Sequence, residues 1–331
     1  MIAALYRTWL LRAPLPFFGV PLLFFLFAWV PGGDGTLLSE FLLSDGNLRF
    51  VAVQSVVVAM AAIGMSAIIA SGRIDFSAGA QMVFYATLGA AVAARSPVPA
   101  VAGVLVAGAV GGTLNGWLVE TLQSRSSVVT LAVGALFLAL VELLPPVPIG
   151  EFSPWMAVFP TPGWLVVAPG VWLTLGVAAL VWLLLQTTVY GRQLLAVGSD
   201  ETAARLCGVR VRRVRLWTFA LAGLLFALAG WLAQAGGSSA ERGEAMFWEF
   251  DVVAAVLIGG TPLRGGSVSL PGTLAGAFFL SLLRNGVWQA GWPPAVAEVA
   301  VGGSILLALA WERFRRAHQH APAAPAWLEA R

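Results

Sequence analysis

The sequence predicts an all-α membrane protein, a polytopic bundle of about ten transmembrane helices. Three observations predict this class. Of the 331 residues, 59% are hydrophobic and only 11% are charged, whereas a soluble domain carries roughly 25% charged residues. Apolar runs of about 20 residues, the length that crosses a bilayer, recur along the whole chain. Gly-rich breaks that contain charged residues follow two of the runs, a pattern typical of transport paths.

Hydropathy places the expected spans in order at 14–30, 49–70, 76–94, 98–119, 127–144, 165–187, 214–235, 250–260, 271–287 and 294–311. The first resembles a signal peptide, but no small-residue cleavage site follows it, so it is kept as a helix. The eighth is too short to cross alone and ends in Gly-Gly-Thr-Pro, which favours a broken or re-entrant element. We therefore expect a transmembrane domain over 1–316 and a disordered cytoplasmic tail over 317–331.

The distribution of arginine orients the spans, because cytoplasmic loops are enriched in basic residues. All nineteen basic residues are arginines. With both termini in the cytoplasm, only Arg49, Arg95, Arg242 and Arg284 fall outside. The opposite orientation would invert this ratio, so ten spans with both ends cytoplasmic is the predicted topology.

Two Gly-rich breaks occupy comparable places in the two halves, within 68–80 and 256–276. Counting spans, a repeat of spans two to five on spans seven to ten would be inverted in the membrane. The alternative is that glycine serves close helix packing, which we assign to Gly108, Gly112 and Gly116. The glycines assigned to the breaks are Gly72, Gly79, Gly259, Gly260, Gly265 and Gly266.

A basic segment, 189–213, interrupts the chain after the sixth predicted span. Ser199 is the expected N-cap of a short helix, acidic residues follow in its first turn, and Gly208 fits its C-terminal stop. The arginines from Arg210 to Arg215 are explained by topology and by lipid headgroups. A short capped helix of small residues is suited to the groove of another protein.

Three stretches resemble one family, the sugar-importing ABC permeases of the ribose/galactose/xylose type. They are YGRQLLAVGSDETAARLCGV (190–209), the C-terminal signature FDVVAAVLIGGTPLRGGSVSLPGTLAGAFFLSLLRNGV (250–287) and SGRIDFSAGA (71–80). The resemblance covers about 45–315. Arg73 stands where the family usually has Gly, and Phe76 replaces the usual Leu.

The resemblance implies a ten-helix permease in a bacterial cytoplasmic (inner) membrane. It implies a second permease copy or related chain, a cytoplasmic ATPase subunit and an extracytoplasmic sugar-binding protein as partners, besides lipid and without nucleic acid. No P-loop is present, and the chain has no Lys to complete one, so we expect no enzyme activity or bound cofactor here, with ATP and Mg on the ATPase. The residues expected to couple to that ATPase are Ser199, Asp200, Glu201, Ala203, Ala204, Arg205, Leu206 and Gly208.

A sugar path should present neutral hydrogen-bonding groups. The candidates are Gln54, Ser55, Ser77, Gln81, Asn115 and Asn285, with Asp75 orienting the first break. Each could instead bond the backbone of another helix, the commoner role of polar groups in bundles.

Three alternatives remain open from the sequence. A permease for branched-chain amino acids or nucleosides shares the fold and part of the loop. A proton-coupled secondary transporter is raised by Glu142 and Glu298 in predicted spans, although both could reach water at span ends. A non-transporting scaffold is disfavoured by the paired breaks.

Overall fold

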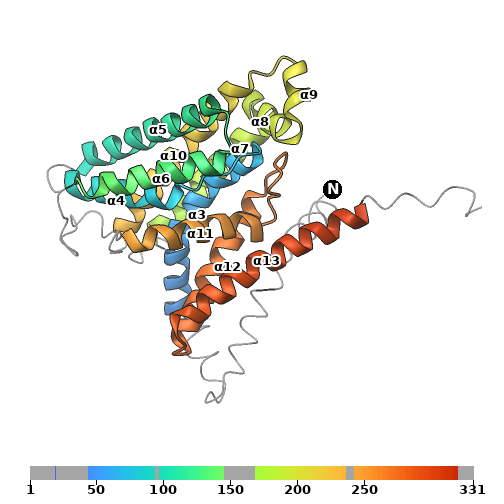
Figure 1. The fold of residues 1–331 in the computed structure, drawn as a ribbon. Helices are drawn as coiled ribbons and strands as arrows, with labels where there is room; N and C mark the ends of the chain where they lie inside the picture. The colour runs from blue at the N-terminus through green and yellow to red at the C-terminus, as the bar shows by residue number, and fades with distance from the viewer. Residues whose placement is uncertain (1–18, 20–43, 94–96, 145–167, 236–241, 320–331) are drawn as a thin grey trace, which may run out of the picture.

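The computed structural model describes residues 19, 44–93, 97–144, 168–235 and 242–319, and every regular element in these ranges is an α-helix (Figure 1). In chain order the helices are α3 (Asp45–Ala70), α4 (Ala78–Ala93), α5 (Pro97–Leu122), α6 (Ser126–Val141), α7 (Pro169–Thr187), α8 (Val189–Ser199), α9 (Glu201–Leu206), α10 (Val211–Ala235), α11 (Arg242–Ile258), α12 (Leu270–Gln289) and α13 (Pro294–Gln319).

The second to tenth predicted spans all coincide with helices, while the first lies outside the described residues apart from Gly19. The eighth is longer than predicted, because α11 begins at Arg242 rather than at 250. Its first turns (RGEAMFWE) carry charges that lower the hydropathy without preventing a helix. The last helix, α13, continues to Gln319, past the expected start of the tail.

Five of the described helices are long and apolar enough to cross a membrane, over Gly46–Ala70, Ala100–Leu122, Pro169–Thr187, Val211–Ala235 and Pro294–Arg315. Two shorter apolar helices cover Ala78–Val92 and Ser126–Val141. The chain is therefore a helical membrane bundle. The count of ten spans and the inverted repeat stay predictions. The two breaks do not take equivalent places in the proposed repeats, because one follows the first helix of its repeat (α3) and the other follows the second helix (α11).

Helices α3 and α10 form the centre of the bundle. Helix α3 packs against α10, α11 and α12, and α10 also packs against α4 and α5. Helix α3 is buried on all sides from Val58 to Ala70, as expected for a helix that is apolar all round. Small residues permit the close approach: a β-carbon on Gly64 would lie 3.0 Å from the Cα of Ala222 on α10.

The glycines assigned to packing have that role. A β-carbon on Gly108 would lie 2.6 Å from the carbonyl oxygen of Gly223, and one on Gly112 would lie 2.2 Å from that of Phe219. Helices α5 and α10 therefore touch backbone to backbone, as small-residue pairs in membrane helices allow. A β-carbon on Gly116 would likewise meet the Phe219 side chain at 2.7 Å.

Candidate functional site

The basic segment folds into two short helices, α8 and α9, at one end of the bundle (Figure 1). The N-cap of α9 is Asp200, whose Oδ1 accepts the N–H groups of Thr202 at 2.8 Å and Ala203 at 3.0 Å. The predicted N-cap, Ser199, is wrong: it is the last residue of α8, and its Oγ donates to the carbonyl of Leu195. Both residue types cap well, so the sequence could not tell at which of them α8 ends.

Helix α9 ends at Leu206, and Gly208 takes the predicted place just after its C-cap, Cys207. Gly208 has φ +81°, a left-handed conformation that glycine adopts without steric cost. Its N–H donates to the carbonyl of Arg205, and the N–H of Val209 donates to that of Ala204. These two bonds make a Schellman motif, which satisfies carbonyls at the end of the helix.

The predicted coupling residues divide between two faces of α9. Ala203, Arg205 and Leu206 are exposed, and Leu206 is 85% exposed. Ser199, Asp200 and Gly208 are also exposed. Ala204, by contrast, is only 5% exposed, and Glu201 points back toward α10. The six exposed residues are available to a partner, whereas Ala204 and Glu201 face the bundle.

Both Gly-rich breaks begin with the same backbone motif. At the end of α3, the N–H of Gly72 donates to Ile69 and that of Arg73 to Ile68. At the end of α11, the N–H of Gly260 donates to Leu257 and that of Thr261 to Val256. Gly72 and Gly260 have φ +79° and +85°. Each helix therefore stops in a Schellman motif with a glycine that a side chain would strain.

The two breaks and the end of α8 meet at one point, which we call the glycine junction (Gly72, Gly198, Gly265 and Gly266). The N–H of Gly266 donates to the carbonyl of Ala70 at 2.9 Å, one of the carbonyls that the end of α3 leaves without an intrahelical partner. A β-carbon on Gly198 would lie 1.8 Å from that oxygen and 2.6 Å from the Gly266 nitrogen. One on Gly265 would lie 2.7 Å from the Gly72 nitrogen. Backbone from three distant segments thus packs without side chains between.

The two remaining break glycines serve close packing. A β-carbon on Gly79 would lie 1.9 Å from the carbonyl oxygen of Ala245 on α11. One on Gly259 would lie 2.5 Å from the nitrogen of Thr273 on α12. These glycines hold the helices beside each break against their neighbours.

Four of the predicted path residues form one buried hydrogen-bonded network. Asp75 accepts the backbone N–H of Ser77 at 2.8 Å, the Ser77 hydroxyl and an Nδ2–H of Asn115 at 2.9 Å. Gln81 donates to the Ser77 Oγ at 2.8 Å. All four side chains are essentially inaccessible to solvent. They join the first break to α4 and α5 rather than line an open path in this conformation.

Helix α6 holds the other backbone groups of the first break. The N–H of Ile74 donates to the Ser126 Oγ at 3.2 Å, and that of Phe76 donates to the Thr130 Oγ1 at 2.8 Å. Ser126 and Thr130 are one turn apart, so they share a face of α6. Sequence reasoning did not find them, although hydroxyl residues one helical turn apart were a usable signal.

The other path candidates lie on α3 and α12. Asn285 exchanges two 2.9 Å amide hydrogen bonds with Asn47, and Gln289 donates to the same Asn47 at 3.3 Å. Ser55 donates to the carbonyl of Ala52 in its own helix. Gln54 is exposed on α3.

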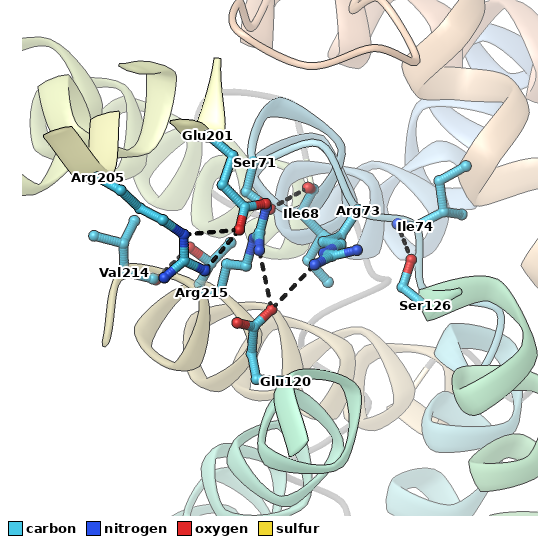
Figure 2. Close-up of polar contacts among 11 residues, drawn as sticks. Ile68, Ser71, Arg73, Ile74, Glu120, Ser126, Glu201, Arg205, Val214 and Arg215 are labelled. Carbon is cyan, nitrogen blue, oxygen red and sulfur yellow. Dashed lines mark hydrogen bonds and ion pairs between the residues drawn. The ribbon is translucent and has the colours of Figure 1, made fainter. Parts of the chain in front are cut away.

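A chain of ion pairs connects α9, α10, α5 and the first break (Figure 2). Arg215, at the start of α10, contacts Glu120 of α5 at 3.2 Å and Glu201 of α9 at 2.6 Å. Glu120 also lies 3.5 Å from Arg73 in the first break, and Glu201 also pairs with Arg205 at 2.6 Å. The lipid-headgroup interpretation is wrong for Arg215, because this side chain is only 3% exposed. Glu120 was missed, although an acid near the end of a predicted span was a signal.

The arginines around Glu201 keep its carboxylate ionised to lower pH than an isolated glutamate. The hydrogen bond from Arg215, with those from Arg205, lowers the pKa of Glu201 to about 2. A carboxyl whose pKa falls on folding stabilises the fold above its unfolded pKa and loses that contribution as pH falls through the folded value. We expect the melting temperatures of wild type and Glu201→Gln to differ by a constant amount between pH 5 and 8, and this difference to shrink progressively as pH falls from about 4.5 to about 2. Thermal unfolding in detergent across this range tests it. Convergence already near pH 7 would contradict it.

Glu298 belongs to a second ion-paired group. Arg284 of α12 forms two hydrogen bonds to Asp251 of α11, at 2.8 and 3.0 Å, and two to Glu298 of α13, at 2.6 and 3.4 Å. Arg284 therefore ties three helices together, and Glu298 shares this cation with Asp251. Glu142 is exposed at the C-cap of α6. Neither carboxylate lies isolated inside the bundle.

Comparisons with known proteins agree with the extent of the bundle. A model of the family described as "Branched-chain amino acid transport system / permease component" matches residues 47–309. The chain is 30% identical to the ribose import permease protein RbsC of Escherichia coli K12 over 288 residues, which are 82% of this chain and 87% of that protein. It is 31% identical to RbsC of Bacillus subtilis over 280 residues (82% and 84%). It is 33% identical to the galactofuranose transporter permease protein YtfT of E. coli K12 over 256 residues (76% and 75%). No solved structure gives a significant match.

Proposed function

Since the chain belongs to the branched-chain amino acid transport system / permease component family, we propose that it is the membrane-spanning permease subunit of an ABC importer for a monosaccharide. The glycine junction is the observation that carries this proposal. It places the end of α8, which leads into α9, directly against both Gly-rich breaks. A movement imposed on α9 from outside the membrane can therefore reach both interruptions of the bundle.

Sugar is the proposed substrate because the relatives matched over most of their length are named for ribose and galactofuranose import. The buried network around Asp75 consists of neutral amides and hydroxyls around one carboxylate. The separate Asn47–Asn285 pair consists of two neutral amides. Such groups suit a polyhydroxyl solute once the bundle opens. The description of the family model favours branched-chain amino acids as a second candidate. Uptake of labelled ribose against labelled leucine separates the two.

The proposed partners follow from the same reading. A cytoplasmic ATPase subunit binds and hydrolyses ATP with Mg, and an extracytoplasmic binding protein delivers the substrate. A second permease copy or related chain completes the path. Both termini and α9 face the cytoplasm of a bacterial inner membrane, as the arginine distribution predicts. Coupling requires that the ATP-bound ATPase favour one conformation of the bundle over the other.

Proton coupling is the weaker alternative. Because Glu298 is paired with Arg284 at 2.6 Å and Glu142 is exposed at the end of α6, each has a structural or solvated role. Full uptake by a Glu142→Gln/Glu298→Gln variant would exclude the proton-coupled alternative.

Affinity purification from native membranes tests the proposed function. We expect a P-loop ATPase to co-purify with the wild type and to be lost from Leu206→Asp, because Leu206 is the most exposed apolar side chain of α9. Burying a carboxylate in an apolar groove is costly without a partner. Ala204 is unsuitable for this test, since a large side chain there would disrupt the fold instead.

Arg213→Asp is the matched control, an added acid in the same segment on an exposed residue of α10. Both variants should melt at the wild-type temperature. If no ATPase accompanies the wild type while the protein still moves substrate in proteoliposomes, the ABC assignment fails.

A further inference from the structure

Four charged side chains of alternating sign form a continuous contact path, which we call the ion-pair chain: Glu201, Arg215, Glu120 and Arg73. They come from four elements: α9, the start of α10, the end of α5 and the first break. Successive charged atoms lie 2.6, 3.2 and 3.5 Å apart. Figure 2 shows the four side chains turned toward one another across the space between these elements.

The middle of the ion-pair chain is buried and its ends are not. Arg215 is 3% and Glu120 is 6% exposed, whereas Arg73 is 27% and Glu201 is 36% exposed. Charge pairs attract more strongly where water is excluded, and separating a buried pair leaves an uncompensated charge at high cost. The central pair therefore resists separation. A displacement of Glu201 moves Arg215 and Glu120 with it more readily than it breaks the chain.

The far end of the ion-pair chain lies next to the buried polar network. Arg73 is two residues before Asp75, which accepts hydrogen bonds from Ser77 and from Asn115 of α5. Helix α5 also carries Glu120, so the helix contacts the first break twice, once through each cluster. A displacement of Arg73 therefore moves the backbone of the first break, which positions Asp75 for its hydrogen bonds from Ser77 and Asn115.

We propose that the ion-pair chain transmits the movement of α9 to the first break, so that Glu120 and Arg73 are positioning residues that set how tightly ATP hydrolysis is coupled to transport. This inference rests on the proposed function. It adds a side-chain connection to the backbone contact at the glycine junction. The two connections reach the first break from different sides, one through α8 and the other through α5 and α10.

The test compares Glu120→Gln, Arg73→Gln and the double variant in the full importer, reconstituted with its ATPase and binding protein in proteoliposomes. The readout is substrate imported per ATP hydrolysed. We expect each single variant to keep ATP hydrolysis while this ratio falls roughly fivefold or more, the size of an ordinary coupling between sites. Because Arg73 acts through Glu120, the double variant should be no worse than Glu120→Gln alone. Arg73→Lys, which keeps the charge, should recover most of the ratio.

Arg213→Gln is the control, since this exposed arginine makes no ion pair with any described residue and should couple like the wild type. The melting temperature of each variant separates a folding defect from uncoupling. If Glu120→Gln does not fold, the partly exposed Arg73→Gln decides the question. A wild-type ratio in Arg73→Gln, or effects that multiply in the double variant, would overturn the ion-pair chain and leave the proposed function standing. Absence of ATP-driven uptake in the wild type would instead refute the proposed function.

Discussion

Replacing Gly198 with alanine should abolish ATP-driven uptake and destabilise the protein by about 3 kcal/mol, the upper end of the range for an overpacked interior. The added β-carbon would lie 1.8 Å from the carbonyl oxygen of Ala70 and 2.6 Å from the backbone nitrogen of Gly266. Neither is the flexible end of a side chain, so α8 or one of the breaks has to move. That movement stretches the Gly266–Ala70 hydrogen bond, which joins the second break to the end of α3.

Two glycines provide matched controls for this substitution. Gly176 lies inside α7 with no atom near its missing β-carbon, so Gly176→Ala should leave uptake unchanged and stabilise the helix by up to about 1 kcal/mol. Gly208 has open space but φ +81°, so Gly208→Ala should cost about 1 to 2 kcal/mol through its backbone alone. Thermal unfolding and uptake measured on all three separate steric overlap from backbone strain. Gly198→Ala behaving like Gly176→Ala would show that the three segments do not meet as described.

The helices were largely predictable, because a membrane-spanning helix requires a long apolar run that is visible in the sequence. Helix boundaries were harder to predict where a helix begins in a charged stretch of low hydropathy, as α11 does at Arg242. They were also harder to predict where two good capping residues are adjacent, as at Ser199 and Asp200. The breaks could be found because the left-handed conformation at Gly72 and at Gly260 favours glycine, and such clusters are visible in a sequence.

The meeting of these elements could not be predicted from local pattern. Nothing in the sequence near Gly198 indicates that Ala70 and Gly266, more than sixty residues away on either side, pack against it. Likewise, Arg215 is one of several arginines over 205–215, and only the fold shows that its side chain is buried against Glu120. Residues that act through tertiary contact carry no periodicity of their own.

Arg215→Gln should have the second large effect, a loss of about 3 to 5 kcal/mol of stability, as when one partner of a buried ion pair is removed. The substitution removes the cation that Glu120 and Glu201 share, and Glu120 is itself only 6% exposed. Arg205→Gln is the contrasting control, because Arg205 also pairs with Glu201 but is 57% exposed. An exposed pair of this kind contributes about 0.2 to 1 kcal/mol.

The origin of that loss can be separated from a simple packing defect. If the poorly compensated Glu120 carboxylate is responsible, Arg215→Gln/Glu120→Gln should be more stable than Arg215→Gln alone, since the second substitution removes a buried charge whose remaining ion pair is the 3.5 Å contact with Arg73. If lost packing around the guanidinium is responsible, the two effects should add. Chemical or thermal unfolding of the four proteins of this cycle in detergent decides between them. A further informative result is a double variant that is stable yet imports little substrate per ATP hydrolysed. That result would show that Arg215 serves transport through its contacts with Glu120 and Glu201, and not only through the stability that it supplies.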